Sequence, residues 1–488
     1  MELEVVHQPV PSRCGRRKRG LATTVLVSVS SGLLMSSISG IFAYPSVALP
    51  QLTGTNETLQ LSIPQASWFA TMPLFLCIPG SVVGGLLCER LGPRRTQILF
   101  SPLLSLSLVA MHLGSWRFIQ EAGAAQVILL ITRAIQGTII SLLNPTIAVY
   151  PCEVSSARHR GIVGSLIESW ASLGLLLCYV MAKYLHWYTA AWLLPLTTIV
   201  PSFFGLLIAP ESPLWLFRKG REGKAIATLL RLRDSPEEVV REITELKKNS
   251  EKNTSCSKLL QIVRRRANAV PMTISVTLLM LKEFSGLSVL TLYIVTIFQL
   301  AGVGLDPFSS SIVIGSTRLV FNFFGSALLH RLPRRYLLIR GNFLTAVTTG
   351  TIGIFFYLQA REYDLTQVNS LPLISLVIYM LGMSVGVGPV TWLMAAELLP
   401  GPVRSLGLGV TVTGYAITSF VVSKTFEDVK ALIGLHGLFW CYSVGCVAYM
   451  LFVIFIVPET QGRTLKEIEN FWAKSGYEKE VPSEDDDV

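Results

Sequence analysis

Long apolar runs separated by short polar segments dominate the chain between residues 20 and 458. Nine stretches contain no Asp, Glu, Lys or Arg, and each is about as long as the ~20 residues that a bilayer-spanning α-helix needs, or longer. Four further apolar stretches are interrupted only by isolated charges. The pattern predicts twelve membrane spans, at residues 21–43, 66–88, 97–115, 124–148, 162–183, 190–209, 272–300, 310–330, 337–359, 371–396, 405–424 and 433–457.

The composition agrees with this pattern. Of the 488 residues, 51% are hydrophobic and only 15% are charged, whereas ordinary soluble domains carry about 25% charge. The mean hydropathy is +0.53. A soluble chain of this length cannot bury twelve such helices, so we predict an all-α polytopic membrane protein.

The placement of the basic residues predicts the orientation of the chain. Of 41 Lys and Arg residues, 33 lie in the two terminal tails and in every second loop between the spans. By the positive-inside rule, both termini and the long 211–269 loop face the cytosol. The same placement argues against nucleic acid as the partner of a chain whose net charge is +10. Asn56, in Asn56-Glu57-Thr58, is then the glycosylation candidate on the outer side.

Three features recur about 245 residues apart and indicate an internal repeat. Gly84–Arg94 matches Gly325–Arg335, and Pro210-Glu211-Ser212 matches Pro458-Glu459-Thr460. A Glu and an Arg with equal spacing bracket one loop in each half. We therefore predict two six-helix bundles with a pathway between them. The predicted segments are a basic N-terminal arm, an N-terminal bundle, a cytosolic linker, a C-terminal bundle and a C-terminal tail, at residues 1–20, 21–210, 211–269, 270–457 and 458–488.

Two local patterns predict irregular or additional helices. In the linker, Ser235-Pro236-Glu237-Glu238 has the order of a helix cap, and Val239, Ile243 and Leu246 follow on one helical face. In the tenth span, Gly382, Gly386, Gly388 and Pro389 are expected to let the helix break and bend.

Charged residues gather at the predicted cytosolic ends of the helices. Arg side chains there pair with carboxylates and with the last carbonyls of helices, which ties neighbouring helices together. We predict a cytosolic gate network; the alternative is that these residues only set the orientation of the chain. Its members are Arg90, Arg94, Glu153, Arg160, Glu211, Arg331, Arg335, Glu397, Arg404 and Glu459.

These motifs resemble those of the sugar porter family of the major facilitator superfamily, from about residue 20 to residue 473. The residues that carry the resemblance are Arg90–Arg95, Tyr150 with Glu153 and Arg160-Gly161, Pro210–Pro213, Gly388–Trp392 with Glu397, and Pro458–Gly462. The segment Phe420–Glu469 is most similar to the insect facilitated trehalose transporters. The resemblance implies the major facilitator fold and transport of a sugar.

The resemblance also implies where a sugar binds, and there this chain departs from the family. The two Gln of the seventh span are replaced by Lys282 and Glu283, and a following Asn by Ser288, while Tyr293 keeps the family pattern. Glu168 stands at the fifth-span position where the family has Gln, and Arg318 at the eighth-span position where it has Asn. In the tenth span, Ser384 stands at a Glu position, whereas Trp392 is retained. In the eleventh span, Tyr415 and Ser419 stand at two Asn positions.

Charges at membrane depth are costly and usually functional. Glu168 shares a helical stripe with Gly164, Ser165, Ala171 and Ser172, small residues typical of a surface that packs on another helix or faces a cavity. We expect Glu168 or Glu283 to pair with Arg318 or Lys282. Three interpretations follow. The pairs bind a sugar or polyol, the substrate is a charged or other polar solute, or the pairs lock the cavity of a sensor.

We expect a monomeric secondary carrier in the plasma membrane that moves trehalose, a hexose or a related polyol by alternating access. The first span contains no acid, which favours uniport, although Glu168 or Glu283 could replace the acid of a proton symporter. The sequence offers no catalytic constellation, so we expect no enzyme activity, and we expect no cofactor or metal. Small-molecule substrate and membrane lipid are the expected partners. Arg133, inside the fourth span, is expected to tether helices rather than bind a ligand.

Overall fold

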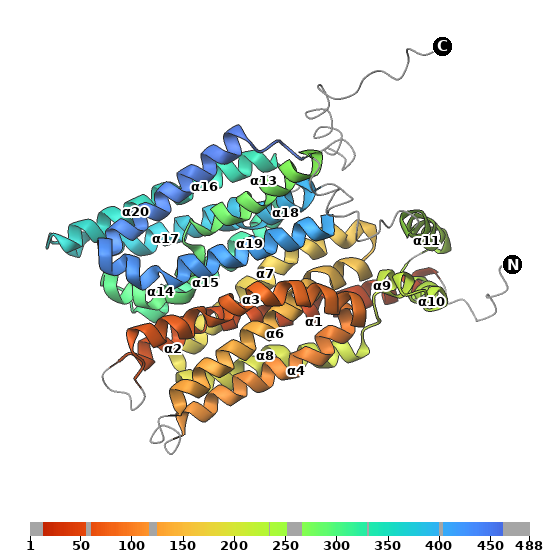
Figure 1. Ribbon diagram of the computed structural model, residues 1–488, viewed down its shortest axis with the longest axis horizontal. Coiled ribbons are helices and arrows are strands. Elements are labelled where there is room, and N and C mark those ends of the chain that lie inside the picture. The colour runs from red at the N-terminus through yellow and green to blue at the C-terminus, as the bar shows by residue number, and fades with distance from the viewer. Residues whose placement is uncertain are drawn as a thin grey trace, which may run out of the picture.

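The computed structural model describes residues 13–54, 60–116, 124–233, 235–250, 266–328, 331–399 and 404–461. Two groups of long helices lie side by side, one red to yellow and the other green to blue in Figure 1. The first group holds α1 (Arg13–Ala43), α2 (Pro45–Leu52), α3 (Ile63–Leu91), α4 (Pro93–His112), η1 (Leu113–Ser115), α6 (Ala125–Val154), α7 (Ala157–Tyr184) and α8 (Trp187–Ile208).

The second group follows three shorter linker helices. These are α9 (Pro213–Arg218), α10 (Glu222–Leu232) and α11 (Pro236–Ser250). The second group consists of α13 (Arg266–Glu283), α14 (Leu287–Ala301), α15 (Pro307–Leu328), α16 (Arg334–Ala360), η2 (Thr366–Val368), α17 (Leu371–Gly382), η3 (Met383–Val387), α18 (Gly388–Leu398), α19 (Arg404–Lys424) and α20 (Phe426–Phe455).

The helices confirm the predicted membrane spans. Within the described residues, ten helices or broken helices are long and apolar enough to cross a bilayer, and α3 adds an eleventh when its two segments, bent by 57°, count as one. The 21-residue helix α19 occupies the predicted eleventh span and completes the set. The chain is a multi-pass membrane protein.

Helix packing repeats between the groups. Helix α1 packs on α7 as α13 packs on α19, and α4 packs on α6 and α8 as α16 packs on α17 and α20. Small residues make these crossings close. A β-carbon built at Gly174 of α7 would lie 1.8 Å from the Ser36 carbonyl of α1, so only glycine fits there.

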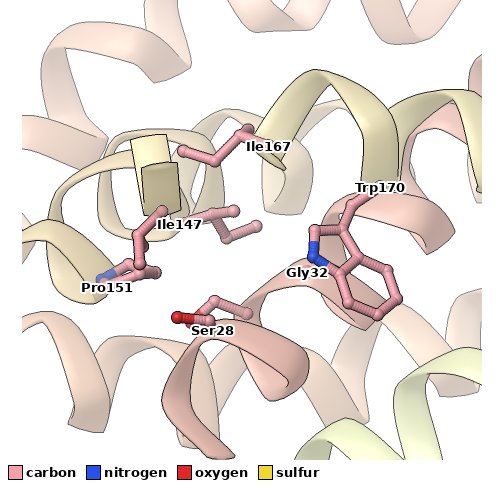
Figure 2. Close-up of a pocket in the computed structure, with 8 residues that line it drawn as sticks. Ser28, Gly32, Ile147, Pro151, Ile167 and Trp170 are labelled. Atoms are coloured by element: carbon pink, nitrogen blue, oxygen red, sulfur yellow. The ribbon is translucent and has the colours of Figure 1, made fainter. Parts of the chain in front are cut away.

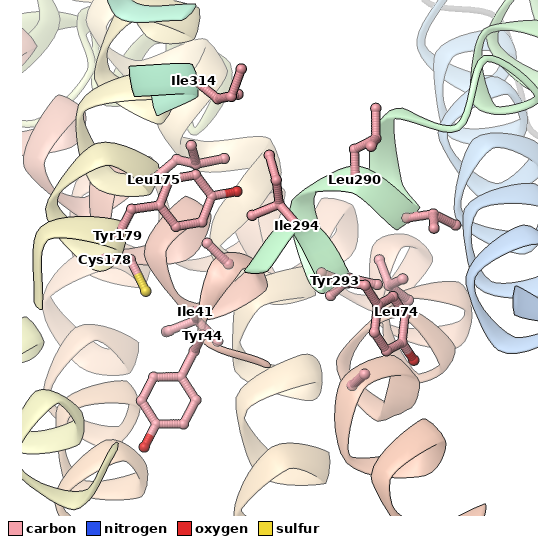
Figure 3. Close-up of a cluster of buried hydrophobic side chains, with 14 of the residues drawn as sticks. Ile41, Tyr44, Leu74, Leu175, Cys178, Tyr179, Leu290, Tyr293, Ile294 and Ile314 are labelled. Carbon is pink, nitrogen blue, oxygen red and sulfur yellow. The ribbon is translucent and has the colours of Figure 1, made fainter. Parts of the chain in front are cut away.

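The two groups meet along one seam. Helix α7 packs on α15, α3 on α19, and α2 on α14. Apolar residues of α14 bridge the seam: Figure 3 shows Ile294 on the side of Tyr179 and Ile41 of the first group, and Tyr293 beside Leu74. Polar contacts join α7 to α15 as well: Asn322 Nδ2 donates to Ser172 Oγ at 2.5 Å. The small-residue stripe around Glu168 is therefore a helix–helix surface, as its sequence predicts.

The seventh predicted span is not one continuous helix. It breaks between α13 and α14, where Gly286 has a φ of +84°. That left-handed conformation is easy only for glycine. The break places Lys282 and Glu283 at the end of α13, and Ser288 in the first turn of α14. The tenth span bends as predicted, because a π-helical turn, η3, separates α17 from α18.

The linker helices form as the sequence predicts. The Ser235 hydroxyl accepts a hydrogen bond from Glu238 N at 3.2 Å and caps α11. Ile243 and Leu246 of α11 pack against Trp215 and its neighbours in α9. These helices lie at one end of the molecule, opposite the α2–α14 contact (Figure 1).

Arg133 ties three helices of the first group together. Its side chain is fully buried, donating from Nε to Phe69 O at 2.9 Å and from Nη1 to Ile41 O at 3.0 Å. Both carbonyls would normally accept from the residue four positions later, and those residues, Pro73 and Pro45, have no N–H. Arg133 therefore replaces two hydrogen bonds that prolines remove, which fits the predicted tether.

Candidate functional site

Glu168 and Arg318 face each other across the seam. Arg318 Nη2 of α15 lies 4.0 Å from Glu168 Oε2 of α7, and their side chains are 14% and 28% exposed. The structure thus brings together two of the four intramembrane charges in one of the expected pairs. Because the pair joins the two groups of helices, it lies where a pathway between them would run.

Exchanging the two charges tests whether this pair acts across the seam. Glu168→Arg or Arg318→Glu alone places like charges about 4 Å apart, so we expect solute uptake to fall roughly tenfold. The double variant Glu168→Arg/Arg318→Glu restores the attraction and should recover uptake to within about threefold of wild type. Uptake is measured in proteoliposomes containing equal amounts of monodisperse protein. A double variant as impaired as the single ones would contradict the pairing.

Lys282 contacts aromatic rings instead of a carboxylate. Its Nζ lies 5.2 Å from the centre of the Trp392 ring and 5.6 Å from that of Tyr415, and these two rings are 5.1 Å apart. The side chain is 4% exposed. Among the described residues, none accepts a hydrogen bond from this ammonium group. Cation–π contact stabilises the ammonium and leaves its three N–H donors available to a ligand.

Glu283 is held by serines of two other helices. The Ser288 hydroxyl of α14 donates to Glu283 Oε2. Because that hydroxyl has a single proton, the Ser419 hydroxyl of α19, 2.8 Å away, is the donor to Ser288. Glu283 Oε1 is buried and has no partner in the described part of the chain. A fully buried carboxylate oxygen without a donor is costly, which favours a ligand or proton at this position.

The other two predicted substrate residues lie apart from these contacts. Tyr293 is buried at a kink in α14 and stacks on Phe426, with ring centres 4.5 Å apart. Ser384 is buried within η3. These contacts therefore bring eight of the ten predicted residues into one pair and two small clusters. The pair and the clusters also interact electrostatically: the charges of Glu168 and Glu283 attract the Lys282 ammonium, and that of Arg318 repels it.

A small pocket lies inside the first group of helices, away from the seam. Figure 2 shows Ser28 and Gly32 of α1, Ile147 and Pro151 of α6, and Trp170 of α7 around it. Its volume of about 10 Å³ suffices for one water molecule at most. The pocket is an internal packing gap and cannot hold a sugar.

The first cluster of the predicted gate network ties the ends of α4, α6 and α8 together. Arg94 donates from Nε to Leu206 O and from Nη2 to Leu207 O, both at 2.9 Å, at the end of α8. Its backbone N–H donates to Glu211 Oε1 at 3.1 Å. Glu153 accepts from the Ser212 hydroxyl at 2.5 Å. Burial raises the pKa of the Glu211 carboxyl, although backbone N–H groups oppose the shift.

The second cluster repeats this arrangement with one unpredicted member. Arg335 Nη2 donates to Ile454 O at the end of α20, and Glu459 accepts from the backbone N–H groups of Arg334 and Arg335 at 3.2 and 3.0 Å. Glu397 is paired with Arg334. Sequence reasoning missed Arg334, because its counterpart in the first repeat is a proline. Each of these contacts stays within one group of helices.

For five predicted positions the structure gives no contact that tests the predicted role. Arg90 and Arg331 are exposed, and no hydrogen bond or ion pair of either guanidinium group is found among the described residues. The side chains of Arg160 and Arg404 lie outside the described part of the structure, and so does Asn56. Their roles stay predictions.

Sequence reasoning also missed a contact at the opposite end of the seam. Lys424, at the end of α19, donates to Ser67 Oγ of α3 at 3.0 Å and lies 4.2 Å from the centre of the Trp68 ring. Phe420 packs beside the same ring. The pattern that could have revealed this contact is the lone lysine that ends an apolar span opposite a tryptophan near the start of another.

Comparison with known proteins finds a family and its relatives. The sugar (and other) transporter family profile matches residues 22–472. The facilitated trehalose transporter Tret1 of Polypedilum vanderplanki is 33% identical over 448 residues, which cover 91% of this chain and 86% of that protein. Tret1 of Anopheles gambiae is 32% identical over 450 residues, again 91% of this chain but only 55% of the longer relative.

Solved structures share the fold. The proton:xylose symporter XylE bound to 6-bromo-6-deoxy-D-glucose superposes with a TM-score of 0.74 at 22% identity, covering 93% of this chain and 99% of XylE. The inward-open form of XylE from E. coli gives a TM-score of 0.73 at 21% identity, covering 93% and 100%. The two helical groups are thus the halves of a major facilitator fold.

Proposed function

This chain belongs to the sugar (and other) transporter family, and on that premise we propose that it is a facilitative carrier that moves a sugar across the plasma membrane. The carrier works as a monomer by alternating access, with both termini in the cytosol. Its substrate is trehalose, a hexose or a related polyol. It performs no enzymatic step and uses no cofactor.

The observation that carries this proposal is the placement of polar groups along the seam. The Glu168–Arg318 pair joins α7 to α15, and the Glu283–Ser288–Ser419 cluster joins α13, α14 and α19. In transporters of this architecture, substrate binds between the two halves near the middle of the membrane, and rocking of the halves exposes it to either side. Hydroxyls, an ammonium and carboxylates supply the donors and acceptors that sugar hydroxyls require.

Three groups of residues take named roles in this proposal. Lys282, Glu283, Ser288 and Ser419 hydrogen-bond the sugar, and Trp392 and Tyr415 present ring faces to it. The Glu168–Arg318 pair borders the same pathway, together with Tyr293 and Ser384. The cytosolic clusters around Arg94 and Arg335 hold the helix ends of each half in register as the halves rock.

The mode of transport is uniport, because the first span contains no acid. Uptake of labelled trehalose and hexoses into proteoliposomes should then be equal, within about twofold, with and without an inward pH gradient. Protein-free vesicles and vesicles made permeable to protons serve as controls. Uptake that requires the gradient would reject uniport.

One observation favours a proton-coupled carrier as the second candidate. Glu283 is fully buried, with Oε1 free of any partner among the described residues, so a proton could occupy this site. In that case the gradient-dependent uptake disappears in Glu283→Gln, while exchange of solute at equal concentrations on both sides persists. The same vesicles therefore separate the two candidates.

A further inference from the structure

An apolar groove opens in the second half, between α15 and the segment formed by α17 and η3. Its volume is about 490 Å³, and one wall is formed by Phe321, Phe324, Ala327 and Leu328 of α15. Leu381 of α17 and Val385 of η3 form the other wall. Phe324 is 66% exposed, so the groove lies on the surface of the protein. In a membrane-spanning helix bundle, such a face meets lipid.

The groove is apolar and runs along α15 for about two thirds of the thickness of one leaflet's hydrocarbon. From Phe321 to Leu328, α15 rises about 10 Å, since an α-helix rises 1.5 Å per residue. The hydrocarbon of one leaflet is about 15 Å thick, half of the ~30 Å core. The groove ends at Arg331, at the helix ends that we assign to the cytosol.

Arg331 has a free charge, unlike its basic neighbours. Arg334 pairs with Glu397, Arg335 binds a helix-terminal carbonyl, and the Arg340 guanidinium lies 4.2 Å from the centre of the Tyr336 ring. Arg331 is exposed, and none of the described residues forms an ion pair or hydrogen bond with its guanidinium group. The groove thus combines an apolar surface that an acyl chain could occupy with the Arg331 cation, which lies at the depth of the lipid headgroups.

We propose that this groove binds an anionic phospholipid of the cytosolic leaflet, with an acyl chain along α15 and its phosphate on Arg331. The cytosolic leaflet carries anionic lipids, and Arg residues near its surface attract them. The site has a route to the transport pathway, because Val385 of the groove follows Ser384 in η3. A β-carbon on Gly325 of α15 would lie 2.6 Å from the Ser384 carbonyl, so the groove wall and the π-helical turn are in direct contact.

Native mass spectrometry of the full-length protein, released from micelles containing dioleoyl phosphatidic acid or phosphatidylcholine, tests this proposal. Wild type should retain phosphatidic acid selectively. Arg331→Gln should bind it roughly fivefold more weakly, the effect of one lost surface cation. Ala327→Trp fills the groove and should prevent retention while leaving Arg331 in place. Arg90→Gln, the matching arginine of the first repeat, should bind like wild type.

Four results would overturn the assignment. Equal retention in Arg331→Gln and wild type would remove the headgroup contact, and equal losses in Arg331→Gln and Arg90→Gln would indicate general surface charge. Retention of phosphatidylcholine as strong as that of phosphatidic acid would remove the selectivity. Inorganic phosphate is added in a parallel arm, and a thermal stabilisation by phosphate equal to that by the lipid would identify a simple anion site. If Ala327→Trp does not fold, Arg331→Gln decides the matter alone.

Discussion

Replacing Arg133 with methionine is expected to lower the free energy of unfolding by about 3–9 kcal/mol, at about 1–3 kcal/mol for each of three buried acceptors that lose their donor. The acceptors are the carbonyls of Phe69 and Ile41 and the side-chain oxygen of Gln136, each within 3.0 Å of an Arg133 nitrogen. Arg133 is fully buried, so bulk solvent does not contact the groups that lose their donors. Methionine keeps most of the volume, so packing loss contributes little.

A double-mutant cycle with Pro73→Ala isolates the cause. An alanine at position 73 supplies the backbone N–H that Phe69 O lacks, so Pro73→Ala should recover about 1–2 kcal/mol in the Arg133→Met protein. In the wild-type background the same change finds Phe69 O already occupied and should bring no gain. Thermal unfolding in detergent, followed by tryptophan fluorescence, measures all four proteins. Equal effects of Pro73→Ala in both backgrounds would show that the hydrogen bond from Arg133 to Phe69 O does not contribute to stability.

Replacing Lys282 with methionine is expected to weaken solute binding about 10- to 100-fold without lowering stability. A hydrogen bond from a charged donor contributes about 1.5–3 kcal/mol, which corresponds to this range in affinity. Stability should stay equal or rise, because a buried ammonium that lacks a carboxylate partner is costly to the fold. Apparent affinity comes from the concentration dependence of uptake, and stability from thermal unfolding of the same preparation.

Lys424→Met is the matched control for this experiment. Lys424 also lies over a tryptophan ring, at 4.2 Å from Trp68, but at the far end of the seam. Its removal should change the affinity for solute by less than about threefold. An Lys282→Met protein that loses stability but keeps its affinity would assign Lys282 to the fold and not to the ligand.

The sequence predicted the membrane spans because lipid demands long apolar helices, and that demand acts locally. Ser235 and Val239 likewise predicted the capped linker helix, since a cap and an apolar face are features of one short segment. The bend in the tenth span followed from its glycines and proline. These features depend on residues close together in the chain.

The candidate site depends on residues far apart, and there the prediction was incomplete. Nothing near Lys282 in the sequence indicates that its ammonium lies between Trp392 and Tyr415 instead of beside Glu168. The break at Gly286, which separates Glu283 from Ser288 by a turn, reads in the sequence as part of one continuous span. The sequence did not predict Arg334 as a member of the gate network, because the two repeats differ at that position. In each case tertiary packing decides which partner is reached.

Counterflow of labelled trehalose and hexoses into preloaded proteoliposomes tests the central claim most directly, when wild type is compared with Glu168→Gln, Lys282→Gln, Glu283→Gln and Arg318→Asn. These changes restore the neutral amides of the sugar porter pattern. If the seam residues select the solute, wild type shows counterflow of at least one sugar, and the variants change the order of preference among sugars. Ligand binding without counterflow, or an order of preference that all four variants leave unchanged, would contradict a carrier whose substrate site lies between its two halves.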